Sequence, residues 1–301
     1  MDAEYGLAPT RDGLLAIVEM AQSSGLALVE QDRWDPLRAS TFGTGEVILA
    51  ACRHESARVV VCVGGSATTD GGAGAAQALG IRLLDGDGED LPPGGGALER
   101  LSSIDVTSLH PSVRRIPVVV ATDVDNPLTG PNGAATVFGP QKGASEEDVA
   151  LLDRALGHFA AVIYRDLGID VRHVEGGGAA GGLGAGLMAF LGARLRPGFD
   201  LVAEVLDLSS RLHRADVVVT GEGRFDRQSA GGKAPARVLE MARDARCRSV
   251  LIAGDIEEGL TPQADLVYSL SARAGREASL ARPAEVLEEA AAEAAARIGG
   301  E

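Results

Sequence analysis

The chain has 301 residues, which is enough for one large or two medium-sized domains with substantial hydrophobic cores. Its formal net charge of −15 at pH 7 excludes the broad positive field with which proteins attract nucleic acids or anionic membranes. The sequence shows no signal-peptide pattern, no membrane-spanning apolar run, no metal-ligand spacing of histidines and no C-x-x-C pair. We therefore expect a cytoplasmic protein with reduced thiols and small-molecule partners, in which an anionic ligand would need a local positive pocket.

Apolar runs and helical periodicities alternate along the chain. Short runs rich in β-branched residues predict strands at 14–18, 59–63, 116–121, 217–220 and 250–253. Apolar residues at helical spacing predict helices at 45–53, 73–79, 146–167, 183–191, 234–245 and 283–298, and Ser145 is the expected N-cap of the third. This alternation predicts an α/β fold with a largely parallel sheet, and an RPG turn before a new strand predicts a domain boundary within 196–215.

The first glycine-rich loop, GGSATTDGG at 64–72, follows the apolar run RVVVCV and precedes a predicted helix. Glycines let a backbone pass close to a ligand, Ser66 and Thr68 add hydroxyl donors, and N–H groups at a helix start attract anions. Asp70 could hold a cation or cap the helix. A tight turn in which Asp70 serves only as a cap explains this loop equally well.

A second polar segment, DVDNPLTGPNGAATVFGPQKG at 123–143, follows the run IPVVVAT. Alternation along an extended chain places Asp123 and Asp125 on one side at the carboxyl end of that strand, next to Asn126. A carboxylate beside an amide can accept a proton from a hydroxyl or bind Mg²⁺. An Asx-turn in the D-N-P sequence is a rival explanation for Asn126, and a simple turn is favoured for Asn132.

The third loop, GGGAAGGLGAG at 176–186, contains a formal G-x-G-x-x-G, the fingerprint of dinucleotide sites. The preceding RHVE is a poor strand, and the nearest suitable acid, Asp200, follows a loop instead of a strand. A dinucleotide-dependent oxidoreductase is therefore disfavoured. We expect the small residues to let the backbone pack tightly against a ligand or another helix.

The fourth loop, GEGRFDRQSAGGK at 221–233, follows DVVVT and precedes a predicted helix. It is not a Walker A loop, since one glycine is missing and an alanine stands where serine or threonine is required. The GGK at a helix start would still suit a phosphate, and Glu222 and Asp226 could reach a metal. The alternative is a surface ion pair of Arg224 with Asp226 beside an ordinary helix start.

Lysine is nearly absent from the chain. Of 28 basic residues only Lys142 and Lys233 are lysines, and each lies in a glycine-rich loop. A compact ammonium group can reach a phosphate oxygen in places too narrow for a planar guanidinium. We therefore interpret both lysines as candidates for phosphate contacts.

Taken together, the four motifs resemble the bacterial glycerate kinase family (glycerate kinase type 1). The resemblance runs, in the family's order, through GGSATTDGGAGAAQALG, DVDNPLTGPNGAATVFGPQKGAS, GGGAAGGLGAGLMAFLGARLRPG and TGEGRFDRQSAGGKAP, and so covers most of the chain. It implies transfer of the γ-phosphoryl group of ATP to a hydroxyl of D-glycerate, with ATP and Mg²⁺ as cofactors. Glycerate and ATP are then the expected partners, and a homo-oligomer is compatible with this reading.

The resemblance also implies roles for the candidate residues. Asp123 would be the base or orienter for the glycerate hydroxyl, while Lys142 and Lys233 would neutralise phosphate oxygens. Arg224 would take the glycerate carboxylate. The remaining contacts implied are Asn126 and Ser66 for the substrate, Gly64, Gly65, Thr68, Gly71, Gly231 and Gly232 for nucleotide or phosphate, and Asp125 or Glu222 for Mg²⁺.

The family fold has two α/β domains with a ligand cleft between them, one of them flavodoxin-like and assembled from both ends of the chain. Residues 1–209 would form the larger, glycine-loop-rich domain, and residues 210–301 the later half of the flavodoxin-like domain. Family members usually open with several dozen further residues, including Ser-Phe-Lys and Asp-Gly-Gly-Glu-Gly-Thr segments. These are expected to be missing here, so the alternative function is a truncated, non-catalytic family member with residual ligand binding.

Overall fold

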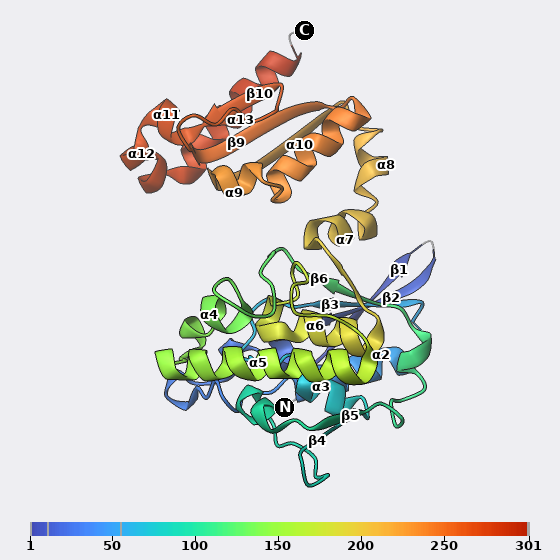
Figure 1. Ribbon diagram of the computed structural model, residues 1–301. Coiled ribbons are helices and arrows are strands. Elements are labelled where there is room, and N and C mark those ends of the chain that lie inside the picture. Colours follow the sequence, from blue (N-terminus) through green and yellow to red (C-terminus); the bar gives the residue numbers. More distant parts are fainter. Residues whose placement is uncertain (1, 11, 55, 300–301) are drawn as a thin grey trace. The chain divides into compact units, whose positions relative to one another are not determined.

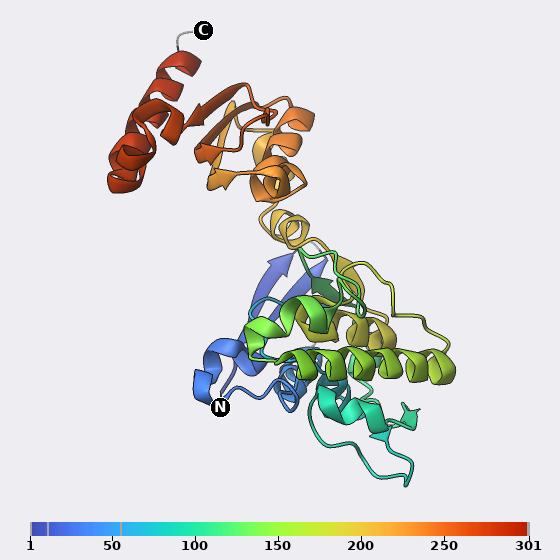
Figure 2. The same ribbon diagram turned by 60° about the vertical axis from the view of Figure 1, so that its left-hand side comes forward.

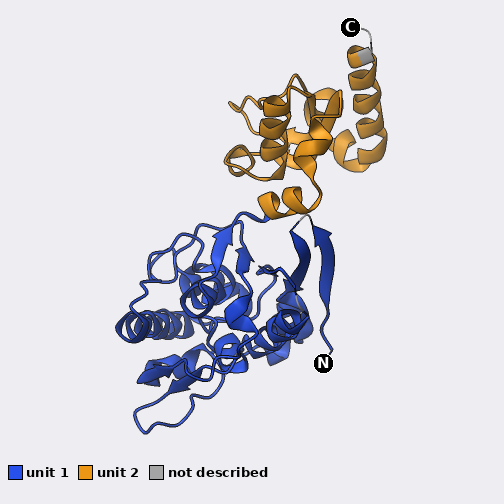
Figure 3. Cartoon of the chain, turned by 90° about the vertical axis from the view of Figure 1, so that its right-hand side faces the viewer, with its two compact units in different colours: residues 1–198 blue, residues 199–301 orange. Residues whose placement is uncertain are grey.

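The computed structural model describes residues 2–10, 12–54 and 56–299 of the chain (Figure 1). The chain divides into two compact units, residues 1–198 and 199–301 (Figure 3). This division lies inside the segment 196–215 in which the sequence predicts a boundary, and before the limit at 209–210 that the family resemblance implies. Throughout the described ranges, no helix has the length and apolar character needed to cross a membrane.

A five-stranded sheet forms the centre of the first unit. Its strand order is β1-β2-β3-β6-β7, and all neighbours are parallel except β1 and β2, which pair antiparallel. Val59 and Val61 of β3 are completely buried, as expected for the middle strand of a covered parallel sheet. The strands are β1 (Tyr5–Thr10), β2 (Gly13–Glu19), β3 (Arg58–Cys62), β6 (Val118–Ala121) and β7 (Arg194–Arg196).

Helices pack against this sheet in two layers, which Figures 1 and 2 show from two sides. One hydrophobic cluster joins the sheet to α2, α3 and α6, and a second joins α3 and α6 to α5 and to the small antiparallel sheet of β4 and β5. Most side chains at these contacts are Ala, Val and Leu, so the layers lie close together. The elements are α1 (Ala21–Ser24), α2 (Phe42–Arg53), α3 (Ala73–Ala78), β4 (Arg82–Leu84), β5 (Ser103–Asp105), α4 (Ala134–Phe138), α5 (Glu146–Leu167) and α6 (Ala179–Leu191), with short 3₁₀ turns at Leu26–Leu28, Gln31–Arg33, Gly95–Arg100, Val113–Arg115 and Pro140–Lys142.

The second unit is a three-stranded parallel sheet, in the order β10-β9-β8, with helices on both faces. Alternate residues of β9 point to opposite faces: Val250 clusters with Val286 of α13, and Leu251 clusters with Leu239 of α10. The elements are α7 (Gly198–Val205), α8 (Leu208–Leu212), β8 (Val217–Phe225), α9 (Arg227–Ala230), α10 (Ala234–Ala245), β9 (Arg248–Ile256), β10 (Leu266–Ser269), α11 (Leu270–Ala274), α12 (Arg276–Ala281) and α13 (Pro283–Gly299).

The predicted α/β class with largely parallel sheets is confirmed, and every strand and helix expected from the sequence is present. The bounds of α5 and α10 agree with the prediction, and Ser145 caps α5 in a capping box with Asp148. The sequence missed β1, β4, β5, β7 and β10. These strands are short or, like β1 with its Pro9, lie at a sheet edge, so their sequences carry no long apolar run.

The glycines of α6 bring its backbone against the loop that follows β3. The N–H of Gly71 donates to the carbonyl of Gly181 at 2.9 Å, and a Cβ on Gly186 would meet the Gly71 carbonyl oxygen at 2.2 Å. This loop and α6 therefore touch backbone to backbone. The third glycine-rich motif thus has the packing role that the sequence favoured over a dinucleotide site.

We expect Gly186→Ala to lower the free energy of unfolding of the first unit by about 1–3 kcal/mol, because the added methyl group forces α6 off the loop. Urea unfolding can be followed through the fluorescence of Trp34, the single tryptophan, which lies in that unit.

Gly157→Ala is the matched control. Gly157 lies in α5, and a Cβ there would meet no atom within 4 Å. That change should leave the unit as stable or stabilise it by up to about 1 kcal/mol. Equal urea midpoints for the two variants would contradict the close packing of α6.

Candidate functional site

Two candidate loops of the first unit follow neighbouring strands. The loop at 64–72 follows β3 and the segment at 123–143 follows β6, and these strands pair in parallel. Their carboxyl ends therefore lie at the same edge of the sheet, where ligands of open α/β sheets bind. Because of this placement, the two loops can contribute residues to one site.

The loop at 64–72 is fastened to the chain that follows β2. The N–H of Leu26 donates to the Gly65 carbonyl at 2.9 Å, and the N–H of Ala67 donates to the Ser24 carbonyl at 3.0 Å. Gly64 and Gly65 remain exposed at the tip, and Ser66 is half-buried. The tip thus presents backbone to solvent, while its two sides are held.

Asp70 is completely buried at the far end of the same loop. Its carboxylate accepts hydrogen bonds from the N–H (2.8 Å) and hydroxyl (2.9 Å) of Thr41 and from the N–H groups of Gly72 and Gly74 (both 3.1 Å). Burial raises the pKa of the Asp70 carboxyl, and these hydrogen bonds oppose that shift. Asp70 therefore joins the beginnings of α2 and α3, although the N-cap position of α3 itself is Gly72.

Lys142 reaches under this loop from the segment after β6. Only 2% of its surface is exposed, and its Nζ donates to the carbonyl of Thr68 at 2.6 Å. Burial lowers the pKa of the Lys142 ammonium group to about 8, and the negative charge of Asp70 acts in the opposite direction. One of the two lysines is thus a buried cation directly beneath the glycine-rich loop.

Two hydroxyl groups near Lys142 lack partners. The Oγ1 atoms of Thr68 and Thr69 are buried and have no hydrogen-bond partner within the described part of the chain. Gly71 is also buried, with a φ of +64° that strongly favours glycine and a position where a Cβ would meet the Phe159 ring at 2.8 Å. Thr68 and Gly71 therefore shape the loop from inside, whereas Gly64 and Gly65 face outward.

The acidic segment after β6 has one exposed carboxylate in a fixed position. Asp123 accepts a hydrogen bond on Oδ1 from the N–H of Gly198 at 2.8 Å, while Asp125 is exposed. The side-chain amide of Asn126 donates to the Asn132 carbonyl at 2.8 Å, so the two asparagines of the chain hold one loop together. This contact joins Nδ2 to a carbonyl six residues further on, so it is not the Asx-turn that was the alternative for Asn126.

The remaining candidates lie in the second unit. Lys233 precedes α10, is exposed, and donates from Nζ to the Oε1 of Gln228 at 3.0 Å; Gly231 and Gly232 beside it are also exposed. Glu222, on β8, has a buried Oε1 without a partner among the residues described. Arg224 is exposed on the same strand, and no ion pair with Asp226 is found in the described ranges.

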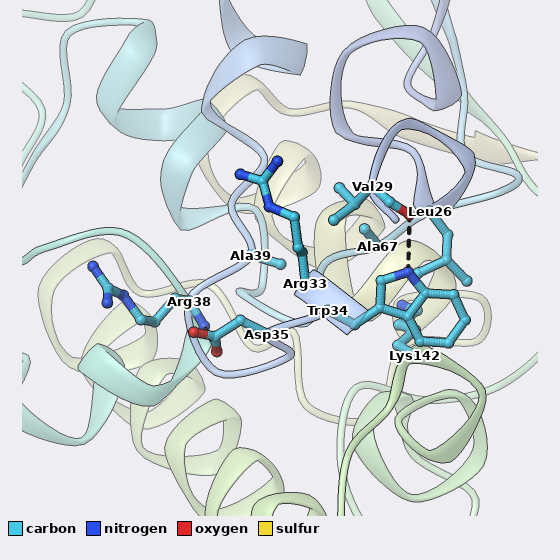
Figure 4. A pocket seen from close by; sticks show the side chains of 9 residues that line it. All are labelled: Leu26, Val29, Arg33, Trp34, Asp35, Arg38, Ala39, Ala67 and Lys142. Carbon is cyan, nitrogen blue, oxygen red and sulfur yellow. Dashed lines mark hydrogen bonds between the residues drawn. The ribbon is translucent and has the colours of Figure 1, made fainter. Parts of the chain in front are cut away.

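The first unit also contains a cavity of about 220 Å³ that the sequence did not predict (Figure 4). Trp34 forms one wall, and Ala67 of the glycine-rich loop and Lys142 form others. Arg33 and Arg38 also line the cavity, with their guanidinium groups directed away from the indole (Figure 4). The only tryptophan of a chain with few aromatic residues was a signal that could have pointed to it. The further lining residues are Leu26, Val29, Asp35 and Ala39.

Protein side chains alone do not form a metal centre here. No group of three or more His, Cys, Asp or Glu side chains suited to a metal ion occurs in the part of the chain that the structure describes. Asp125 and Glu222 remain candidates for an Mg²⁺ ion that arrives on a nucleotide, because such an ion needs only one or two carboxylates in addition to phosphate oxygens.

An exposed glycine loop, a buried lysine and a carboxylate thus lie at one edge of the sheet, an arrangement that would suit a phosphate-bearing small molecule. The sequence profile of the glycerate kinase family matches residues 1–299. The chain belongs to the glycerate kinase family, which confirms the family predicted from the four motifs.

Several relatives are similar over most of this chain. The chain is 46% identical to "Glycerate kinase" of Halalkalibacterium halodurans over 86% of its own length and 68% of the relative's. It is 50% identical to "Glycerate kinase" of Bacillus subtilis (81% and 64%) and 46% identical to "Glycerate 2-kinase" of Escherichia coli (86% and 67%). It therefore spans about two thirds of the length of these relatives.

A crystal structure of a Salmonella typhimurium LT2 protein assigned as glycerate kinase 2 is similar in fold. The TM-score is 0.76 and the sequence identity 43%, over 88% of this chain and 73% of that one.

The buried Lys142 makes stability depend on pH in a defined direction. Its ordinary pKa of 10.5 applies to the unfolded chain and the lowered value of about 8 to the folded chain. Between these values the unfolded state binds more protons, so stability rises with pH across this window. Relative to Lys142→Met, the native chain should gain up to about 3 kcal/mol in free energy of unfolding from pH 7.5 to pH 10.5.

Urea unfolding of both proteins at several pH values measures this difference. Subtracting the free energy of unfolding of the variant from that of the native chain at each pH cancels the contribution of all other titrating groups. Parallel pH profiles for the two proteins would show that Lys142 titrates normally and contradict its burial as a cation.

Proposed function

We propose that this chain transfers the γ-phosphoryl group of ATP to a hydroxyl of D-glycerate. The observation that carries the proposal is Lys142, a cation buried under the carbonyl of Thr68 in the loop at 64–72. Phosphoryl transfer requires positioning and charge neutralisation more than covalent chemistry from the protein, and a preorganised buried cation supplies the latter. Family membership supports both the donor and the acceptor.

In this proposal the loop at 64–72 binds phosphate. Gly64 and Gly65 offer backbone N–H groups at the exposed tip, and the Ser66 hydroxyl adds a donor. Thr68 and Gly71 hold the loop in shape from its buried side. The bonds to Ser24 and Leu26 keep the tip rigid, so little order has to be created when a phosphate binds.

Asp123 is the proposed base or orienter of the glycerate hydroxyl. Its Oδ1 is held by the N–H of Gly198, and its Oδ2 has no partner among the described residues. A carboxylate fixed by one oxygen and open at the other can accept a proton from a bound hydroxyl. Asn126, which closes the same loop, is proposed to support the substrate contact.

The second unit is proposed to supply further charge. Lys233, with Gly231 and Gly232 at the start of α10, would contact phosphate oxygens, and Arg224 would take the glycerate carboxylate. Glu222, which has an unpartnered buried carboxylate oxygen, or alternatively Asp125 of the first unit is a candidate ligand of Mg²⁺. When bound, Mg²⁺ would neutralise charge on the nucleotide phosphates.

We also propose that the protein is located in the cytoplasm. Cys52, Cys62 and Cys247 are free thiols, which agrees with a reducing compartment. A homo-oligomer remains an expectation from the family.

A coupled ADP-release assay with the purified chain, ATP, Mg²⁺ and D-glycerate tests the proposed reaction. We expect ADP release that depends on glycerate. Absence of glycerate-dependent turnover would favour the alternative, a non-catalytic family member that retains ligand binding.

We expect Asp123→Asn to lower kcat at least 100-fold with little change in either KM, because asparagine keeps the acceptor for the Gly198 N–H and loses only the basic oxygen. Asp87→Asn, at an exposed loop position, is the matched control and should retain native kinetics. A kcat within a few-fold of the native value would exclude Asp123 as the base.

A further inference from the structure

We propose that the cavity beside Trp34 receives the adenine base of ATP. This inference rests on the proposed function for the identity of the ligand, and on the cavity for its position. The cavity lies wholly within the first unit, between the chain that follows β2, the loop at 64–72 and the turn at Lys142 (Figure 4). It is the part of the site that the motifs did not reveal.

The size of the cavity fits one ring system. Its volume is about 220 Å³, below the roughly 300–1,000 Å³ of pockets that enclose an entire drug-sized ligand. A purine base can enter while the ribose and phosphates stay outside. The apolar walls come from Leu26, Val29, Ala39 and Ala67, together with the Trp34 indole.

The Trp34 wall is fixed before any ligand arrives. The indole Nε1 donates to the Val29 carbonyl at 3.1 Å, which sets the orientation of the ring. On its other side the ring lies against Gly143, where a Cβ would come within 3.3 Å of it and where φ is +90°. A rigid aromatic wall offers a base contact area without the entropy cost of ordering a side chain.

The charges around the cavity match a base that carries a polyphosphate. Arg33, Arg38 and Lys142 are among the lining residues, and Asp35 is the single acid among them. The walls themselves are mainly apolar, and the guanidinium groups of both arginines are exposed and point away from the indole (Figure 4). The Asp35 carboxylate accepts the backbone N–H of Arg38 at 3.1 Å, and neither arginine has an ion pair within the described ranges. In a chain of net charge −15 this is the local positive pocket that an anionic ligand needs.

The cavity is also joined to the loop proposed to bind phosphate. Ala67 lines the cavity and belongs to that loop, and Leu26 of the opposite wall donates its N–H to the Gly65 carbonyl at 2.9 Å. A base in the cavity would therefore place its phosphates next to Gly64 and Gly65 at the loop tip. Glycerate suits the cavity poorly, because three polar groups on three carbons would be left without partners against apolar walls.

Trp34 is the single tryptophan and forms a wall of the cavity, so its fluorescence in the folded protein reports a ligand bound there. The purified chain is titrated separately with adenosine, ADP, inorganic tripolyphosphate and D-glycerate. We expect adenosine and ADP to quench or shift the emission, with ADP binding at least 10-fold more tightly, and tripolyphosphate and glycerate to leave it nearly unchanged. A response to glycerate without one to adenosine, or no response to either nucleoside or nucleotide, would overturn the proposal.

Ala39→Leu fills the cavity from its wall and gives a second measurement. We expect the KM for ATP to rise at least 10-fold while the KM for glycerate stays within two-fold, and the adenosine response of Trp34 to be lost. Ala150→Leu, at an exposed position of α5, is the matched control and should behave like the native chain. A folded Ala39→Leu variant with a native response to adenosine would overturn the proposal.

Different results would contradict the proposed reaction and the proposed adenine site. ADP release without any adenosine response of Trp34 refutes the adenine site and leaves the proposed reaction standing. An adenosine response without glycerate-dependent ADP release supports the cavity and refutes the reaction.

Discussion

The first unit depends on two buried charges of opposite sign at one end of its sheet. Asp70 has no exposed surface and satisfies four donors from the starts of α2 and α3, while Lys142, almost as buried, donates to the carbonyl of Thr68 in the same loop. Burial of either charge alone would be costly, because an ion loses its hydration. The hydrogen bonds offset that cost only if the loop keeps one conformation. The contacts of Asp70 and Lys142 therefore hold the loop at 64–72 and the starts of the two helices in one arrangement.

This constraint explains why the glycines are concentrated in a few segments. The buried half of the loop, which includes Gly71, packs against α6 backbone to backbone, and a side chain there would displace the helix. The exposed half, Gly64 and Gly65, faces outward, and it is held to the rest of the chain where the Gly65 carbonyl accepts the N–H of Leu26. One motif thus combines a structural half with a half that is available to a ligand, and a pattern of glycines alone does not distinguish them.

The electrostatics of the chain lead to the same end of the sheet. An overall charge of −15 repels anions from most of the surface, yet Lys142, Arg33 and Arg38 line a single cavity beside the rigid loop. Because the rest of the surface is acidic, an anionic ligand is attracted only where these cations gather. The charges therefore determine where the ligand binds more than how tightly it binds. The proposed reaction and the proposed adenine site use this same arrangement.

The sequence by itself determined the fold class, the long elements and the family, because β-branched runs, helical periodicity and four ordered glycine motifs are local patterns that survive without coordinates. It also singled out Lys142 by the rarity of lysine. Only the tertiary structure decided that Asp70 joins two helices, that Asn126 closes a loop onto Asn132, and that Trp34 lines a cavity with Lys142. Each of these depends on contacts between residues far apart in the chain or across a turn, and a residue type does not reveal which partner its polar atoms will meet once it is buried.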